Sequence, residues 1–197
     1  RWDKWLKWNG DSWLNDETNE AFSVARDLCR AASYWPDAAS LTPVSKRQLG
    51  QRRMAANVRD MAGADRRIAA TVDQWDTDPL LLGVPGGVVD LRDGSMLQAT
   101  REQYISKRTA CAPASGTPQL WLDYLQRVHD SNDEIIAYLQ RYAGYCATGE
   151  TKEHALAFLY GTGRNGKGVF LETVSGILGD YSRTASMDTF LQQNHAA

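Results

Sequence analysis

The chain has 197 residues, with 22 lysines and arginines against 24 aspartates and glutamates and a net charge of −2. Its length suffices for one compact domain, or for a domain plus part of another. No overall basic excess marks it as a nucleic-acid-binding protein, so any such surface has to be local. No apolar run approaches the length of a membrane span, which argues against a membrane protein.

Three cysteines, Cys29, Cys111 and Cys146, lie far apart in the sequence. An odd number of separated cysteines argues against a disulfide framework and indicates a reducing compartment. We therefore expect a cytoplasmic protein in which the three thiols are buried as small hydrophobic groups. The three histidines show no ligand spacing with the cysteines or with each other, so the sequence predicts no metal site.

The first predicted element is a small hairpin. Asn9-Gly10 stands between short aromatic-rich runs, and this dipeptide tolerates the positive φ angles of a tight turn. The tryptophans around it could stack on nucleic-acid bases, but packing beneath a neighbouring helix is the more common outcome and the one we favour. These tryptophans are Trp2, Trp5, Trp8 and Trp13.

Two helices are predicted next. Apolar residues recur at helical spacing from about Asp16 to Ser33, and Trp35-Pro36 ends the pattern. Thr42-Pro43 is typical of an N-cap followed by proline at the first helical position. It predicts one helix that runs through about Met61.

The second of these helices and the segment after it are locally basic. Residues 43–70 contain seven basic and two acidic side chains, and the basic ones are Lys46, Arg47, Arg52, Arg53, Arg59, Arg66 and Arg67. We favour an ordinary solvated helix surface. The alternative is contact with nucleic-acid phosphates, for which the candidates are Arg52, Arg53, Arg66 and Arg67.

The sequence then changes from helix to strand. An apolar run at 80–82 is interrupted at 85–87, and a second apolar run ends in Arg92-Asp93-Gly94, a hairpin signal. Residues 111–119 are rich in turn formers and predict a loop. Thr117-Pro118 begins another helix, and Ser131 with Glu134 forms a capping box for the next. We expect these two helices to pack as an antiparallel pair.

The most informative stretch follows. Residues 155–160 form an apolar run of strand length, and residues 169–178 repeat at helical spacing. Between them lies a GxxxxGK pattern at residues 161–167, followed by Gly168, and we call residues 161–168 the glycine-rich loop. Strand, glycine-rich loop and helix in this order are typical of a site that binds nucleoside triphosphates. The candidate binding residues are Gly161, Thr162, Gly163, Arg164, Asn165, Gly166, Lys167, Gly168 and Val169.

Lys167 is the candidate catalytic residue, because a lysine at this position reaches the outer phosphates. Gly168 is unusual, since a serine or threonine there normally lends its hydroxyl to Mg²⁺. No acidic residue follows a second apolar strand, and Arg183 is the only arginine after the loop. We therefore expect these 197 residues to hold an incomplete catalytic domain that hydrolyses little or no nucleotide.

Three separated blocks carry a family resemblance. They are residues 80–109, "LLLGVPGGVVDLRDGSMLQATREQYISKRT", residues 121–151, "WLDYLQRVHDSNDEIIAYLQRYAGYCATGET", and residues 158–191, "FLYGTGRNGKGVFLETVSGILGDYSRTASMDTFL". In this order they resemble the D5-type family of phage and plasmid replication proteins, also called the P4-type primase family, which carries a superfamily 3 helicase. The opening "WNGDSW" is similar to the start of the family's D5 N-terminal region.

This resemblance implies a bacterial or phage-encoded DNA helicase driven by ATP or another NTP with Mg²⁺. Such a protein acts on single-stranded or forked DNA as a homo-oligomeric ring of six, often with a primase domain upstream. The family's phosphate loop maps to Gly161, Gly163, Asn165, Gly166 and Lys167, and Gly168 departs from the family's usual hydroxyl residue. We expect the family's second motif, sensor and arginine finger beyond Ala197.

The predicted fold class is α+β. A mainly helical region with β-hairpins spans residues 1–115, a helical pair spans 116–150, and residues 151–197 begin an α/β P-loop domain of AAA+ type with its first strand, loop and helix. The alternative function is a non-catalytic module, either DNA-binding or ring-forming, in which the phosphate loop is vestigial.

Overall fold

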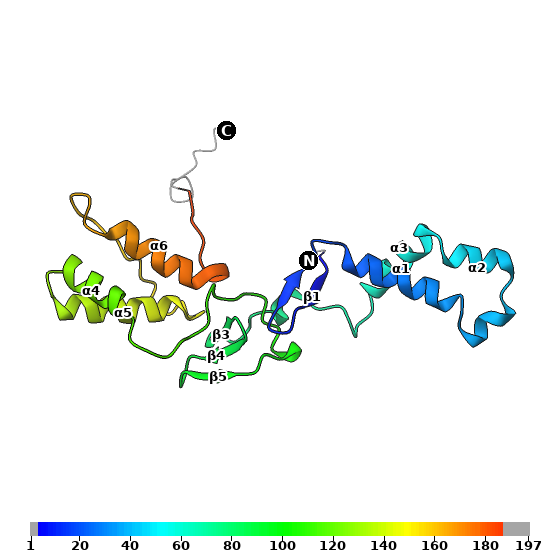
Figure 1. Ribbon diagram of the computed structural model, residues 1–197, viewed down its shortest axis with the longest axis horizontal. Coiled ribbons are helices and arrows are strands. Elements are labelled where there is room, and N and C mark those ends of the chain that lie inside the picture. Colours follow the sequence, from blue (N-terminus) through cyan, green and yellow to red (C-terminus); the bar gives the residue numbers. More distant parts are fainter. Residues whose placement is uncertain (1–3, 187–197) are drawn as a thin grey trace. The chain divides into compact units, whose positions relative to one another are not determined.

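The computed structural model describes residues 4–186, which form two compact units. One unit comprises residues up to Asn9 together with Trp13–Trp75, and the other comprises Gly10–Ser12 and the chain from Asp76 onward. Helices and two small antiparallel sheets make up the described residues, which confirms the α+β class (Figure 1).

The first unit begins with the predicted hairpin. Strands β1 (Leu6–Trp8) and β2 (Trp13–Asn15) pair in antiparallel register, so that Trp8 faces Trp13. The connection spans residues 9–12 and contains the predicted Asn9-Gly10 pair, with Gly10 at a φ of 110°. The Trp13 ring lies 5.7 Å from that of Trp8 and 5.7 Å from that of Trp75. These contacts support packing for Trp8 and Trp13, whereas Trp2 lies outside the described residues.

Helix α1 (Glu20–Ala32) confirms the helix predicted between residues 16 and 33. Asp16 caps its first turn, because the carboxylate accepts hydrogen bonds from the amides of Glu20 and Ala21, each at 2.8 Å. Partial desolvation opposes these bonds, but together they hold the pKa of Asp16 below its ordinary value. Ala25 and Cys29 form the buried side of the helix, which packs along α3.

The single helix predicted from Thr42 through Met61 is wrong. The chain forms α2 (Pro43–Leu49) and then α3 (Arg52–Ala62). The predicted cap is confirmed, since the Thr42 hydroxyl accepts a hydrogen bond from the Ser45 amide at 3.2 Å. The interruption lies at Gly50 and at Gln51, whose ψ of 146° is extended. Glycine is a poor helix former, and tertiary packing of α1 against α3 outweighs the continuous periodicity.

The second unit contains the predicted strands. β3 (Leu81–Val84), β4 (Gly87–Asp90) and β5 (Ser95–Leu97) form an antiparallel sheet in sequence order. Pro85-Gly86 makes the first turn, where Gly86 has a φ of 86° that favours glycine. Val84 and Val88, which are 2% and 0% exposed, anchor the sheet in the core.

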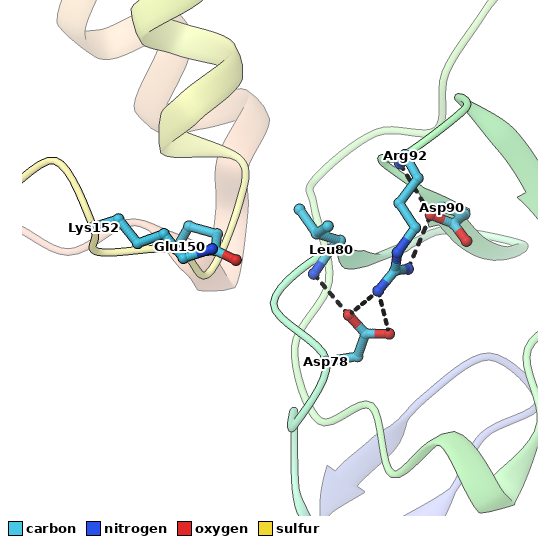
Figure 2. A network of polar contacts seen from close by, with 6 residues as sticks. All are labelled: Asp78, Leu80, Asp90, Arg92, Glu150 and Lys152. Atoms are coloured by element: carbon cyan, nitrogen blue, oxygen red, sulfur yellow. Dashed lines mark hydrogen bonds and ion pairs between the residues drawn. The ribbon is translucent and has the colours of Figure 1, made fainter.

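An ion-pair network holds the start of this sheet to the β4–β5 turn. The Arg92 guanidinium lies 2.8 Å from Asp78 and 3.1 Å from Asp90 (Figure 2). The Leu80 amide, followed by Arg92, lowers the pKa of Asp78. Figure 2 also shows a separate pair at 2.8 Å between Lys152, which is exposed, and Glu150, which is partly buried.

The two helices predicted in the second unit are α4 (Gln119–Val128) and α5 (Asp133–Cys146). The capping box expected from Ser131 and Glu134 is wrong. Asn132 caps α5 instead, and its side chain accepts a hydrogen bond from the Ile135 amide at 3.2 Å. Ser131 has a φ of 59° and lies one residue too early to cap the helix.

The expectation of three buried thiols holds only in part. Cys29 is buried in the first unit, as predicted. Cys111 and Cys146 are exposed, which contradicts the prediction. Cys111 lies in the turn-rich segment before α4, and Cys146 is the last residue of α5, where the packing that buries a thiol ends.

Helix α6 (Lys167–Leu178) and the short 3-10 helix Gly179–Tyr181 complete the second unit. A segment at residues 107–110, which we call the clasp, joins their end to β3. The Thr109 amide donates to the Gly83 carbonyl at 2.9 Å, and the Ala110 amide donates to the Ile177 carbonyl of α6 at 3.0 Å. The Tyr181 hydroxyl accepts from the Gly83 amide at 2.9 Å and donates to the carbonyl of Lys107, also in the clasp, at 3.0 Å.

Replacing Gly83 with alanine should destabilise the second unit by about 1–3 kcal/mol. The added Cβ would meet the Lys107 carbonyl oxygen and lie 2.7 Å from the Ile105 side chain, so the clasp would have to move. Gly144→Ala is the control, because Gly144 lies in α5 with nothing within 4 Å of an added Cβ. Urea unfolding should show a lower free energy of unfolding for Gly83→Ala and a free energy raised by up to about 1 kcal/mol for Gly144→Ala. Equal stability of Gly83→Ala and wild type would contradict the close packing of the clasp against Gly83.

The Tyr181 contact predicts a specific alkaline transition. Burial raises the pKa of Tyr181 to about 12 from its ordinary value of 10.0. A raised folded-state pKa means that the contribution of this phenol to stability is complete below pH 10 and is lost as the pH rises toward 12. The unfolding free energy of the wild type should therefore fall relative to that of Tyr181→Phe between pH 10 and pH 12. Parallel curves for the two proteins across this window would show that the phenol is not held as described.

Candidate functional site

The segment before the glycine-rich loop does not form the predicted strand. Residues 155–160 have no regular secondary structure in the described part of the chain. Leu156, Phe158 and Tyr160 are 82%, 83% and 85% exposed. A strand requires hydrogen-bonded neighbours, and the two described sheets contain only β1 to β5. The apolar run is therefore an extended segment whose large side chains face solvent at alternate positions.

The helix after the loop does form, and it begins at Lys167, two residues before the expected start. Gly166 immediately precedes it with a φ of 84°, and Gly163 has a φ of 101°. Both values lie in the left-handed region that favours glycine. The glycines thus allow the chain to curl and to enter α6 within a few residues.

The loop presents a row of free backbone donors. Among the hydrogen bonds within the described residues, none is donated by an amide of residues 161–169. The first bonded amide of α6 is that of Phe170, which donates to the Gly166 carbonyl at 3.1 Å. Unpaired amides at a helix N-terminus combine with the helix dipole to attract anions. The geometry is suited to phosphate oxygens.

Lys167 lies within this curl. Its ammonium donates to the Asn165 side-chain oxygen at 2.6 Å and to the Gly161 carbonyl at 3.3 Å. Both acceptors are neutral, and no carboxylate of the described residues forms an ion pair with Lys167. The loop therefore holds a positive charge that only neutral dipoles balance. The Lys167–Asn165 contact could not be predicted from the sequence, because it depends on the loop conformation.

Gly161 is required for this arrangement. A Cβ at Gly161 would overlap the Asn165 amide group and lie 3.1 Å from the Lys167 ammonium. A side chain at residue 161 would therefore displace the two groups that line the inside of the loop.

The side chains of the other predicted binding residues make no polar contact among the described residues. Thr162 and Arg164 are exposed, and Val169 is 52% exposed. Gly168 has open space around it and offers no side-chain oxygen. Within residues 4–186, no group of three or more histidine, cysteine or acidic side chains is arranged to hold a metal ion. The loop residues fit a polyphosphate, but position 168 supplies no ligand for Mg²⁺.

Helix α4 also touches the loop, which the sequence did not predict. The Tyr124 hydroxyl donates to the Gly166 carbonyl at 2.8 Å. Trp121 stacks on Phe170 of α6 with ring centroids 5.8 Å apart. The signal in the sequence was an apolar face on α4, but nothing in its spacing indicates which element that face meets.

The four candidate arginines belong to the other unit and fall into two groups. Arg67 pairs with Asp65 at 2.6 Å and lowers the pKa of that carboxyl to about 2, and Arg52 lies over the Phe22 ring at 6.0 Å. Arg53 and Arg66 are exposed and have no polar partner among the described residues. Among the described residues Arg52 also lacks an acidic partner, so only Arg53 and Arg66 of the four have neither an ion pair nor a ring contact.

A family model described as "D5 N terminal like" matches residues 1–130 of the chain. The chain belongs to this D5 N terminal like family. No curated protein matches the chain. The match includes α4 and ends before the glycine-rich loop. No helix of the described residues is long and apolar enough to cross a membrane. The domain boundaries at residues 115 and 150 remain predictions.

Proposed function

We propose that the chain is part of a D5-type replicative DNA helicase of superfamily 3, in which residues 161–169 bind the triphosphate of ATP or another NTP. The observation that carries this proposal is the run of free amides around Lys167 at the start of α6. Membership of the D5 N terminal like family supports the replication context. DNA as the partner and a homohexameric ring belong to the same proposal.

The loop residues have distinct roles in this proposal. The free amides would bind phosphate oxygens and hold the phosphates in line. Lys167 would exchange its contacts with Gly161 and Asn165 for the outer phosphates, where its charge offsets the negative charge that grows during transfer. A bound Mg–nucleotide complex supplies the phosphoanhydride bond that is hydrolysed. Because Gly168 has no hydroxyl, the ion's other ligands have to come from water, the nucleotide or a carboxylate elsewhere.

The exposed apolar surface of the same region supports a motor domain larger than the described residues. Leu156, Phe158 and Tyr160 project at alternate positions, as they do in a strand. Helix α6 buries Phe170 but leaves Leu171 about half exposed. A helix with apolar side chains on more than one side is normally covered by other elements. In the proposed motor, these side chains pack into a parallel sheet.

The second candidate function is a non-catalytic module, DNA-binding or ring-forming, in which the loop is vestigial. One observation favours it, and a second is compatible with it. Gly168 removes a metal ligand from the loop, and Arg53 and Arg66 leave unpaired positive charge on the first unit. Unpaired arginines at a surface can contact DNA phosphates in either protein, so they do not by themselves separate the two functions.

The proposal predicts that the chain binds nucleotide through Lys167. Titration of a fluorescent ATP analogue with Mg²⁺, followed by anisotropy, should show that Lys167→Ala weakens binding about tenfold or more, since a charged hydrogen-bond donor is lost. Lys152→Ala is the matched control, because Lys152 is exposed and, within residues 4–186, pairs only with Glu150. Equal affinity of Lys167→Ala and wild type, or no binding by the wild type, would refute the assignment.

The unpaired arginines Arg53 and Arg66 lead to a separate prediction about the salt dependence of DNA binding. The log of the affinity for single-stranded DNA should fall with the log of salt concentration, and Arg53→Ala with Arg66→Ala should reduce that slope by about 0.7 per arginine. Arg59→Ala is the control, since Arg59 is already paired with Asp60 at 2.7 Å. An unchanged slope in the double variant would show that these arginines belong to an ordinary solvated surface and do not contact DNA phosphates.

A further inference from the structure

The contact between α4 and the glycine-rich loop is more specific than general packing. The Gly166 carbonyl accepts two hydrogen bonds, from the Tyr124 hydroxyl at 2.8 Å and from the Phe170 amide at 3.1 Å. The Phe170 bond is the first of the helix, whereas the Tyr124 bond comes from another element. The carbonyl that begins α6 is thus held from outside the helix.

This carbonyl belongs to the same peptide group as the Lys167 amide. The peptide bond is planar and trans, so its C=O and N–H point in opposite directions. When Tyr124 holds the Gly166 oxygen on the α4 side, the Lys167 N–H is turned away from α4. Tyr124 therefore sets the direction of a free amide in the loop without contacting any ligand itself.

The rest of the α4 face fixes the position of this contact. Trp121 stacks between Tyr124, at 5.1 Å, and Phe170, at 5.8 Å, and Phe170 is 8% exposed. A Cβ at Gly166 would lie 2.8 Å from the Val128 side chain and 3.1 Å from the Tyr124 hydroxyl. Trp121, Tyr124 and Val128 follow one another at helical spacing on one face of α4. Glycine is therefore needed at residue 166 for its backbone angle and also for its small size.

The Tyr124 hydroxyl stays a donor over the working range of the protein. Burial raises the pKa of this phenol above its ordinary value, and the neighbouring Phe170 amide opposes that effect only in part. A raised pKa keeps the proton in place throughout the neutral and mildly alkaline range. The contact with the Gly166 carbonyl therefore does not switch with physiological pH.

We propose that Tyr124 is a positioning residue for phosphate binding: it orients the Gly166–Lys167 peptide, and through it the D5 N-terminal region takes part in building the nucleotide site. Residue 124 lies inside the matched range 1–130, and the loop lies outside it. The inference rests on the proposed nucleotide-binding function and goes beyond it, since it assigns a role to a helix that carries no part of the GxxxxGK pattern.

Tyr124→Phe tests this role, because it removes only the hydroxyl. Two quantities should change, each about threefold to tenfold, as expected for one net hydrogen bond. The dissociation constant for the fluorescent ATP analogue should rise, and amide exchange at Phe170, measured by NMR without nucleotide, should accelerate. Tyr138→Phe is the matched control, since Tyr138 is 54% exposed and stacks only on Tyr142 among the described residues.

Val128→Ala separates positioning from packing. It loosens the same face of α4 and leaves the Tyr124 hydroxyl in place. It should therefore change the dissociation constant for the ATP analogue and the amide exchange rate of Phe170 less than Tyr124→Phe does. Equal effects of the two variants would reduce Tyr124 to a packing role and overturn the proposal.

The two arms also keep this inference distinct from the proposed function. If wild type binds the analogue and Lys167→Ala does not, while Tyr124→Phe matches wild type in both arms, the positioning role alone fails. If wild type does not bind the analogue, the proposed function fails. Unchanged amide exchange at Phe170 in Tyr124→Phe would then refute the Tyr124 contact as well. Faster exchange would confirm the contact, but the role in phosphate binding would still be refuted because no phosphate is bound.

Discussion

The free amides of residues 161–169 are the feature on which the rest of the site depends. Backbone donors are normally paired. A row of unpaired donors at the start of a helix, beside a lysine that contacts only neutral oxygens in the described part of the chain, forms a local concentration of positive potential. An anion with several oxygens satisfies such donors better than scattered waters do, because the helix dipole adds to the attraction. Glycines occupy the loop for a steric reason, because side chains at residues 161 and 166 would collide with their neighbours.

Helix α6 is held at both ends by parts of the chain that lie within the D5 N terminal like match. Tyr124 of α4 holds the carbonyl at its start, and the clasp at residues 107–110 holds the Ile177 carbonyl at its end. The clasp is tied in turn to Gly83 of β3. A change in the loop that tilts α6 would therefore strain contacts with both α4 and the sheet. This arrangement gives a physical route by which the D5 region and a bound phosphate would influence each other.

The sequence predicted several local features and missed those that depend on tertiary contacts. The cap at Thr42 and the turn containing Gly94 were predicted correctly, but the capping box at Ser131 and Glu134 was wrong because Asn132 caps α5 instead. The break at Gly50 was missed because the periodicity continues across it, and the strand at residues 155–160 was wrong because a strand needs partners that the described residues do not provide. In the site, the start of α6 near Lys167 was predictable from the glycine pattern, whereas phosphate binding by the loop residues stays a prediction. Tyr124 was not predictable, since its partner lies 42 residues away.

The most direct measurement of the central claim is an NMR titration of the chain labelled with ¹⁵N-glycine. Glycines occur inside the loop and also in distant turns, so one spectrum contains both the candidate donors and their internal controls. Addition of Mg–ATP should shift the amide signals of Gly163, Gly166 and Gly168 and leave those of Gly86 and Gly94 in place. Loop signals that stay unmoved at saturating nucleotide, or that move no more than those of the turns, would contradict the account.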